Sequence, residues 1–169
     1  MVSFFSRVNV KRVLFAGLVL VLLAGFSGGC KNEVEDDNVN KPGSLPSGLV
    51  GKWVDYDSFE ITTDTIKYDD GGYGFGYEGN IRFISNYDSK SGVIIVEYTT
   101  GAPYATKPFH AIYYLNLTST TVSLNNTWDA TDALYSADTD TLDAAKEKFT
   151  LASMGNWMDL GMAPTYTKQ

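Results

Sequence analysis

The fold class follows from residues 76–99, GYEGNIRFISNYDSKSGVIIVEYT. Side chains alternate between apolar and polar along residues 76–85, which predicts a strand with one buried face. That face consists of Tyr77, Gly79, Ile81 and Phe83. Residues 86–92 are rich in turn-forming types, and residues 93–99 combine β-branched and aromatic side chains, as expected of a second strand. The stretch therefore predicts an antiparallel hairpin.

Short segments of the same kind continue on both sides of this hairpin. We expect further strands at residues 49–54, 59–62, 65–68, 109–117, 121–125 and 164–168. Turn-forming residues separate successive segments, as Asp69-Asp-Gly-Gly72 does in the middle of the chain. Short strands at such regular spacing indicate an antiparallel barrel or sandwich.

One helix is expected near the C-terminus, over residues 140–149, where Asp140 or Thr141 can cap its first turn. Its apolar stripe consists of Leu142, Ala145, Phe149 and Ala152. The predicted fold is therefore mainly β: a small antiparallel up-and-down barrel of about eight strands with one helix near the C-terminus. A barrel of eight strands is either filled by side chains or holds one small ligand.

The first 29 residues have the pattern of a signal peptide. Arg7, Lys11 and Arg12 supply positive charge, residues 13–26 form an unbroken apolar run, and small residues follow. A transmembrane helix needs about 20 apolar residues, so this run is short for a permanent span. We predict a cleaved leader over residues 1–29, and the alternative is an uncleaved anchor helix.

Cys30, the only cysteine of the chain, directly follows this leader. Gly28 and Gly29 before a cysteine resemble the lipobox of bacterial lipoproteins. Ser27 stands where that family usually has a large aliphatic residue, and lipoboxes relaxed in this way are similar to those of spirochaetes. The resemblance implies cleavage before Cys30, a diacylglyceryl group on its sulfur and a fatty acid such as palmitate on its new amine. It therefore implies a membrane anchor made of lipid, in which each buried methylene contributes about 0.8 kcal/mol.

This resemblance also implies a place in the cell and a division of the chain. The lipid anchor places the protein in the bacterial cell envelope. We expect the outer rather than the inner membrane, because Lys31 replaces the Asp that retains enteric lipoproteins in the inner one. Whether the protein faces the periplasm or the cell surface stays open. The expected parts are the leader (1–29), the lipidated cysteine with a tether (30–48) and a barrel domain (49–169).

Composition narrows the range of partners. Residues 30–169 carry a formal charge of −10, which argues against nucleic acid and against binding of an anionic bilayer by charge. Residues 31–48 are polar and contain two prolines, as in an extended spacer. The acidic residues there form either a solvated spacer or a calcium or partner site; they are Glu33, Glu35, Asp36 and Asp37.

No pattern of an enzyme is present. His110 is the only histidine and has no nucleophile motif around it, and with Cys30 acylated no thiol remains for zinc or catalysis. The acidic pairs of the domain lack the spacing of an EF-hand, and Asp also favours turns and helix N-termini. These pairs are Asp55 with Asp57, Asp69 with Asp70, and Asp138 with Asp140. We expect a protein that is not an enzyme and has no metal or cofactor; calcium at an acidic pair and glycoside hydrolysis by two carboxylates are the alternatives.

Gly51-Lys-Trp53 opens the first expected strand. It resembles the G-x-W motif that begins lipocalins and related calycin barrels, although the second and third lipocalin motifs are not visible. More loosely, the chain looks like the small lipocalin-like lipoproteins of spirochaetes. The resemblance implies that Trp53 plugs the closed end of the barrel and that the barrel carries an apolar ligand.

Glycines alternate with aromatic residues in Gly71-Gly-Tyr-Gly-Phe-Gly-Tyr-Glu-Gly79. If the segment is extended, this spacing places the rings of Tyr73, Phe75 and Tyr77 on one face. They form either a mobile lip or partner contact at the barrel mouth, or part of a bent strand whose rings fill the barrel. The neighbouring rings of Tyr113 and Tyr114 are expected on opposite faces.

Two functions of different classes follow. The first is an envelope lipoprotein whose barrel binds a small apolar ligand; its candidate binding residues are Trp53, Tyr73, Phe75 and Tyr77. The alternative is a filled barrel that serves as a scaffold for interaction with a protein or host macromolecule. A cavity of a few hundred Å³ would favour the first. The sequence leaves open the ligand, the partner and the oligomeric state.

Overall fold

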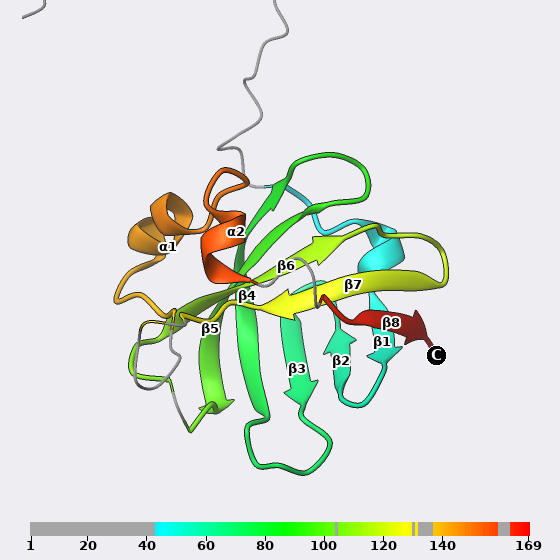
Figure 1. The fold of residues 1–169 in the computed structure, drawn as a ribbon, viewed down its shortest axis with the longest axis horizontal. Coiled ribbons are helices and arrows are strands. Elements are labelled where there is room, and N and C mark those ends of the chain that lie inside the picture. The colour runs from blue at the N-terminus through cyan, green and yellow to red at the C-terminus, as the bar shows by residue number, and fades with distance from the viewer. Residues whose placement is uncertain (1–42, 104, 130, 132–136, 159–162) are drawn as a thin grey trace, which may run out of the picture. The chain divides into compact units, whose positions relative to one another are not determined.

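Eight antiparallel strands close into a barrel in the computed structural model of this protein (Figure 1). The structure describes residues 43–169 except 104, 130, 132–136 and 159–162. Each strand pairs with the next in sequence, and the last pairs with the first. The strands are β1 (Gly51–Val54), β2 (Ser58–Ile61), β3 (Thr65–Asp69), β4 (Tyr77–Asn86), β5 (Gly92–Gly101), β6 (Phe109–Leu115), β7 (Thr121–Asn126) and β8 (Thr165–Lys168). The predicted fold class is confirmed.

The helices lie before and after the main run of strands: the short 3-10 helix η1 (Ser47–Leu49), α1 (Leu142–Lys148) and α2 (Met154–Trp157). Helix α1 begins after Thr141, whose Oγ1 accepts a hydrogen bond of 3.1 Å from the backbone N–H of Ala144. It ends before Phe149, so exposed Ala152 does not continue the predicted stripe. Helix α2 was not predicted, because a single turn is too short to show a helical period.

The β4–β5 hairpin is the longest pairing and contains one departure from the predicted alternation. A register shift between Ile81 and Phe83 inserts an irregularity into β4. As a result Ile84 takes the inward position, while Phe83 packs outside the barrel. The prediction that Phe83 shares a face with Tyr77 is therefore wrong, since alternation along a strand does not survive a bulge.

Side chains from all eight strands fill the interior of the barrel. The buried members of this inner cluster are Leu49, Trp53, Phe59, Ile61, Ile66, Tyr77, Ile84, Ile94, Val96, Ile112, Tyr114, Leu117, Val122, Leu124 and Tyr166. Several rings touch each other, for example Phe59 and Tyr166 at 5.3 Å between centroids. The described interior is thus occupied by protein.

A second apolar cluster lies outside the barrel, where α1 and α2 cover one side of it (Figure 1). Its buried members are Phe83, Val93, Ile95, Ala111, Tyr113, Ala137, Ala145, Phe149 and Met158. Strands β5 and β6 are therefore apolar on both faces. The prediction that Tyr113 and Tyr114 face opposite sides is confirmed, and the outer ring is covered rather than exposed.

One end of the barrel is closed by η1 and Trp53. The Trp53 indole is fully buried, and its Nε1–H donates a hydrogen bond of 2.7 Å to the Leu49 carbonyl. Lys168 of β8 lies with Nζ 5.1 Å from the indole ring and donates to the Gly48 carbonyl at 2.8 Å. Gly51 has φ +139°, and a Cβ there would lie 2.7 Å from Lys168 Cε. Glycine and tryptophan thus both suit this tight corner.

The opposite end carries the β1–β2 hairpin, residues 55–57, and the β3–β4 loop, residues 70–76, at the lower edge of Figure 1. We call it the loop end. At the closed end, residues 43–49 run along the barrel: the Gly43 amide donates to the Ile84 carbonyl at 2.7 Å, and Leu45 packs on the inner cluster. The last residues of the expected tether therefore contact the barrel.

Cys30, the leader and most of the tether lie outside the described residues, so the lipid anchor stays a prediction. In the described part of the chain, neither helix has the length and apolar composition needed to cross a bilayer.

Candidate functional site

The β3–β4 loop at the loop end is organised around the Asp70 carboxylate. Asp70 Oδ1 accepts hydrogen bonds from the backbone N–H groups of Gly72 at 3.0 Å and Tyr73 at 3.1 Å, and Oδ2 accepts one from Phe75. The chain can wrap around one side chain because Gly71, Gly72 and Gly74 adopt φ values of 73°, 101° and 90°. These backbone hydrogen bonds lower the pKa of Asp70 despite the opposing effect of burial.

This folded loop separates the three aromatic side chains that an extended segment would align. Tyr73 is 81% exposed and Phe75 is 44% exposed, whereas Tyr77 is 6% exposed and belongs to the inner cluster. The rings do not share one face. Tyr77 therefore fills the barrel, as one interpretation predicted, while Tyr73 and Phe75 lie on the surface, where a lip or partner contact stays a prediction.

The β1–β2 hairpin contributes a further exposed ring beside this loop. Tyr56 is 95% exposed, the largest exposure among the exposed large apolar side chains of the described residues. The two loops touch, since a Cβ on Gly71 would lie 2.8 Å from the Tyr56 carbonyl oxygen. A groove of about 170 Å³ runs between them, and its walls include Tyr56, Asp55, Asp57 and Asp69.

Beneath the loops, a polar and aromatic cluster fills this end of the barrel. The Tyr77 hydroxyl donates to Asn126 Oδ1 at 2.5 Å and lies 2.8 Å from His110 Nε2. The imidazole stacks on Tyr98 with a centroid distance of 4.2 Å and an interplanar angle of 4°. His110 Nδ1 is buried without a hydrogen bond to any described residue. These rings therefore pack against one another beneath the two loops.

Two carboxylates border this cluster. Asp57 Oδ2 accepts a hydrogen bond of 2.6 Å from the Tyr68 hydroxyl, and Asp138 Oδ1 accepts one of 3.3 Å from Tyr98. Burial, followed by these carboxylates, raises the pKa of both tyrosines. The phenols therefore stay protonated donors at neutral pH and tie the loop end to the barrel.

The buried histidine is uncharged at neutral pH. Burial lowers the pKa of His110 to about 3, against the opposing effect of the Val96 backbone. A general base works best with a pKa near the pH of the reaction. The neutral ring is the form that fits the cluster, with Nε2 at 2.8 Å from the Tyr77 hydroxyl.

This burial predicts a pH dependence of stability. The pKa of histidine in an unfolded chain is about 6.5, so the unfolded state binds the proton more strongly. The stabilisation is complete above pH 6.5 and is lost as the pH falls from there toward 3. Between pH 7 and pH 5 the free energy of unfolding should fall by about 2 kcal/mol, measured by urea denaturation.

The control for this experiment is His110→Gln. Because the chain has no other histidine, the variant should show a nearly flat free energy of unfolding between pH 7 and pH 5. Equal slopes in the variant and the wild type would contradict a buried neutral imidazole.

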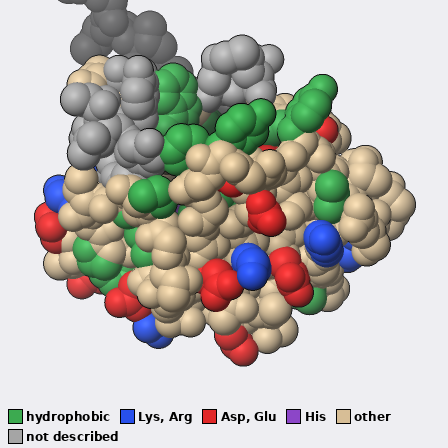
Figure 2. Space-filling view, turned by 90° about the horizontal axis from the view of Figure 1, so that it is seen from below, with side chains coloured by type: hydrophobic (Ala, Val, Ile, Leu, Met, Phe, Trp, Pro, Cys, Tyr) green, Lys and Arg blue, Asp and Glu red, His purple; other side chains and the backbone are tan. Residues whose placement is uncertain are grey.

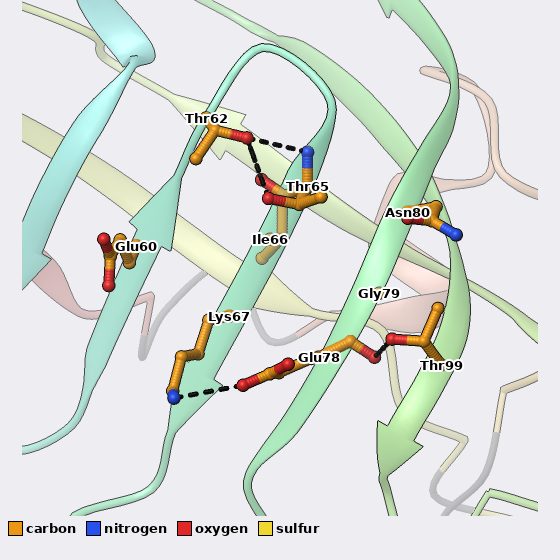
Figure 3. Close-up of a pocket in the computed structure, with 9 residues that line it drawn as sticks. All are labelled: Glu60, Thr62, Thr65, Ile66, Lys67, Glu78, Gly79, Asn80 and Thr99. Carbon is orange, nitrogen blue, oxygen red and sulfur yellow. Dashed lines mark hydrogen bonds and ion pairs between the residues drawn. The ribbon is translucent and has the colours of Figure 1, made fainter.

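A second groove, of about 240 Å³, lies on the outer face of β2 to β5 (Figure 3). Its polar side chains mostly satisfy one another. Lys67 Nζ lies 3.0 Å from Glu78 Oε1, and Thr99 Oγ1 donates to the Glu78 carbonyl at 3.1 Å. Pairs of this kind are typical of a solvated outer sheet face and contribute little to stability. Nothing in the sequence indicated this groove, and its described side chains pair with one another rather than converging on one point.

The face seen in Figure 2 carries apolar and acidic side chains, with basic side chains among the acidic ones. Within the described ranges, no three His, Cys, Asp or Glu side chains come together as a metal site. The carboxylates of the loop end instead accept hydrogen bonds from tyrosines and from the backbone, as Asp57 and Asp70 do.

No protein family, curated protein or solved structure matches this chain.

The structure distributes the four residues expected to bind a ligand over three places. Trp53 lies at the closed end, Tyr77 lies in the interior, and Tyr73 and Phe75 lie on the loop end. Sequence reasoning missed Tyr56, the most exposed ring, although its place between two aspartates in a hairpin was a signal for exposure. It also missed the cluster around His110, since pairing between β4, β5 and β6 brings its members together.

Proposed function

We propose that this protein is a lipid-anchored envelope protein with a filled, lipocalin-like barrel, and that its loop end binds another macromolecule. Acylation of Cys30 would tether the barrel to a bacterial membrane. The barrel would then act as a rigid support that presents Tyr56, Tyr73 and Phe75. It carries out no reaction in this proposal.

One contrast carries the proposal: the rings inside the barrel are packed, while rings on two touching loops are exposed. Tyr166 and Tyr114 in the interior are at most 2% exposed, whereas Tyr56 and Tyr73 are 95% and 81% exposed. Exposed aromatic side chains gathered on neighbouring loops are a feature of interaction sites, and tyrosine is enriched at protein interfaces. The Asp70 hydrogen bonds hold this loop in shape before any partner binds, which reduces the entropy cost of binding.

A small apolar ligand inside the barrel is the competing proposal. Among hollows lined only by described residues, the grooves of about 240, 260 and 170 Å³ are all open to solvent. Drug-sized ligands usually occupy enclosed pockets of roughly 300–1,000 Å³. The inner cluster therefore favours the scaffold over the carrier.

Capture experiments with loop variants test the proposal. Full-length protein in detergent is immobilised through a C-terminal tag and mixed with cross-linked envelope or host-surface extracts. Tyr73→Ala with Phe75→Ala should reduce the recovery of specific partners at least tenfold, because exposed aromatic anchors often carry more than about 1 kcal/mol each. Recovery is measured by quantitative mass spectrometry.

The matched control is Leu151→Ala, which removes another exposed apolar side chain, 53% exposed, from the helical side. It should leave capture unchanged. Labelling with radioactive palmitate tests the anchor separately, with label expected on the wild type and absent from Cys30→Ala. If the loop substitutions leave the recovery of partners unchanged, the loop end is not the binding surface. If the wild type is not labelled by palmitate, the proposed lipid anchor is wrong.

A further inference from the structure

The exposed rings of the loop end have acidic neighbours. The loop-end surface consists of Tyr56, Tyr73, Phe75, Asp55 and Asp69. Asp55 and Asp69 are exposed, and both line the groove of about 170 Å³ that also contacts Tyr56. The only basic side chain in that groove is Lys52.

The whole folded region is negatively charged, like the loop-end surface. Residues 43–169 contain eight lysines and arginines and sixteen aspartates and glutamates, a formal charge of −8. The ion pairs of the described residues are Lys67 with Glu78, Arg82 with Glu97, Lys107 with Asp140, and Lys146 with Asp143. Lys67 also lies near Asp69, and the charge of Asp69 contributes to raising the pKa of Lys67. Asp55 and Asp69 are members of none of these ion pairs. The loop-end surface is thus aromatic and acidic, with Lys52 and Lys67 as its basic neighbours.

We infer that the partner of this surface is a positively charged protein segment, whose lysine or arginine side chain enters the groove between the two loops. This inference rests on the proposed function and specifies the chemistry of its partner. The groove is too small for a drug-sized ligand but suits one long side chain, with its cationic end beside Asp55 and Asp69. Tyrosine faces attract the same cations, so the rings and carboxylates favour one class of partner.

The geometry of the loops suits this role. Asp69 Oδ1 accepts the Gly71 N–H at 3.0 Å, which leaves Oδ2 for a ligand, while Asp70 is used in holding the loop. Complementary charge at an exposed surface mainly increases the association rate and weakens with salt. We therefore expect fast, salt-sensitive binding of moderate affinity.

Fluorescence anisotropy of dye-labelled tetralysine tests the inference with full-length protein in neutral detergent micelles. Binding should weaken at least threefold in Asp55→Asn with Asp69→Asn, because each exposed ion pair contributes about 0.2–1 kcal/mol. Asparagine keeps the acceptor that Gly71 uses, so the loop should fold normally. Tyr56→Ala with Tyr73→Ala should weaken binding by about tenfold. Lys52→Gln should strengthen it, and tetraglutamate should not bind.

The matched control removes the same charge at a distance. Asp143→Asn with Glu147→Gln acts on exposed carboxylates of α1 and should change tetralysine binding by less than about twofold. Equal losses in the two acidic double variants would overturn the inference, since they would show a general charge effect. If tetralysine fails to bind while loop-dependent capture persists, the partner chemistry is wrong and the proposed function stands. If capture is also independent of the loops, both fail.

Discussion

Replacing Trp53 by alanine should lower the free energy of unfolding by about 3–5 kcal/mol, the range found when a large buried aromatic is removed. The indole is fully buried at the closed end, and its N–H donates to Leu49. Its loss would leave a cavity beneath η1, an unpaired Leu49 carbonyl and a Lys168 ammonium without its ring. Urea denaturation at pH 7 measures the effect.

Two control variants separate the loss of packing at Trp53 from a general effect of substitution on stability. Trp53→Phe keeps most of the apolar volume and should cost less than the alanine variant. Tyr73→Ala removes a ring that is 81% exposed and should change the free energy of unfolding by less than about 0.5 kcal/mol. If Trp53→Ala were as stable as Tyr73→Ala, the closed end described here would be wrong.

Replacing Tyr77 by alanine should also cost about 3–5 kcal/mol. Its ring contacts Tyr68, Tyr98 and His110 at centroid distances of 5.4, 5.1 and 4.7 Å, and its hydroxyl links His110 to Asn126. The smaller change Tyr77→Phe keeps the ring but removes the hydroxyl. It should cost about 1–3 kcal/mol, the penalty of unpaired buried polar groups.

The double variant Tyr77→Phe with Asn126→Leu distinguishes the origin of this cost. Removing both hydrogen-bonded partners should restore part of the stability that the single variant loses. Thermal unfolding at pH 7 gives the comparison. A Tyr77→Phe variant as stable as the wild type would show that the hydroxyl does not stabilise the cluster, and a Tyr77→Ala variant as stable as the wild type would show that the ring is not part of it.

Most of the fold could be predicted from the sequence because alternation and turn residues record which face of each strand is buried. All eight strands form within one or two residues of the expected ranges, and α1 forms inside its expected range. Prediction failed where the tertiary structure overrode the regular alternation of side chains along a strand. The irregularity near Ile81 moved Phe83 to the outer cluster, and nothing in the alternation of β4 indicates where a bulge will form.

The site was harder to predict than the fold. The glycine-aromatic segment was visible in the sequence as a candidate. Tyr73 and Tyr77 lie in different places because the loop folds around the Asp70 carboxylate, and the spacing of residues along a strand does not predict these hydrogen bonds. The groove between the loops depends on the closeness of residues 55–57 to residues 69–71, which comes from the β2–β3 pairing between them. The filled interior depends on the packing of all eight strands together.

The central claim is that side chains, and not a ligand, occupy the barrel. Native mass spectrometry of full-length protein, extracted gently from its own membrane, tests this claim most directly. We predict the mass of residues 30–169 plus covalent lipid on Cys30, with no further molecule retained as the detergent is removed. A stoichiometric apolar molecule bound without a covalent bond, and retained equally when Tyr56 and Tyr73 are alanine, would contradict the account and favour a carrier.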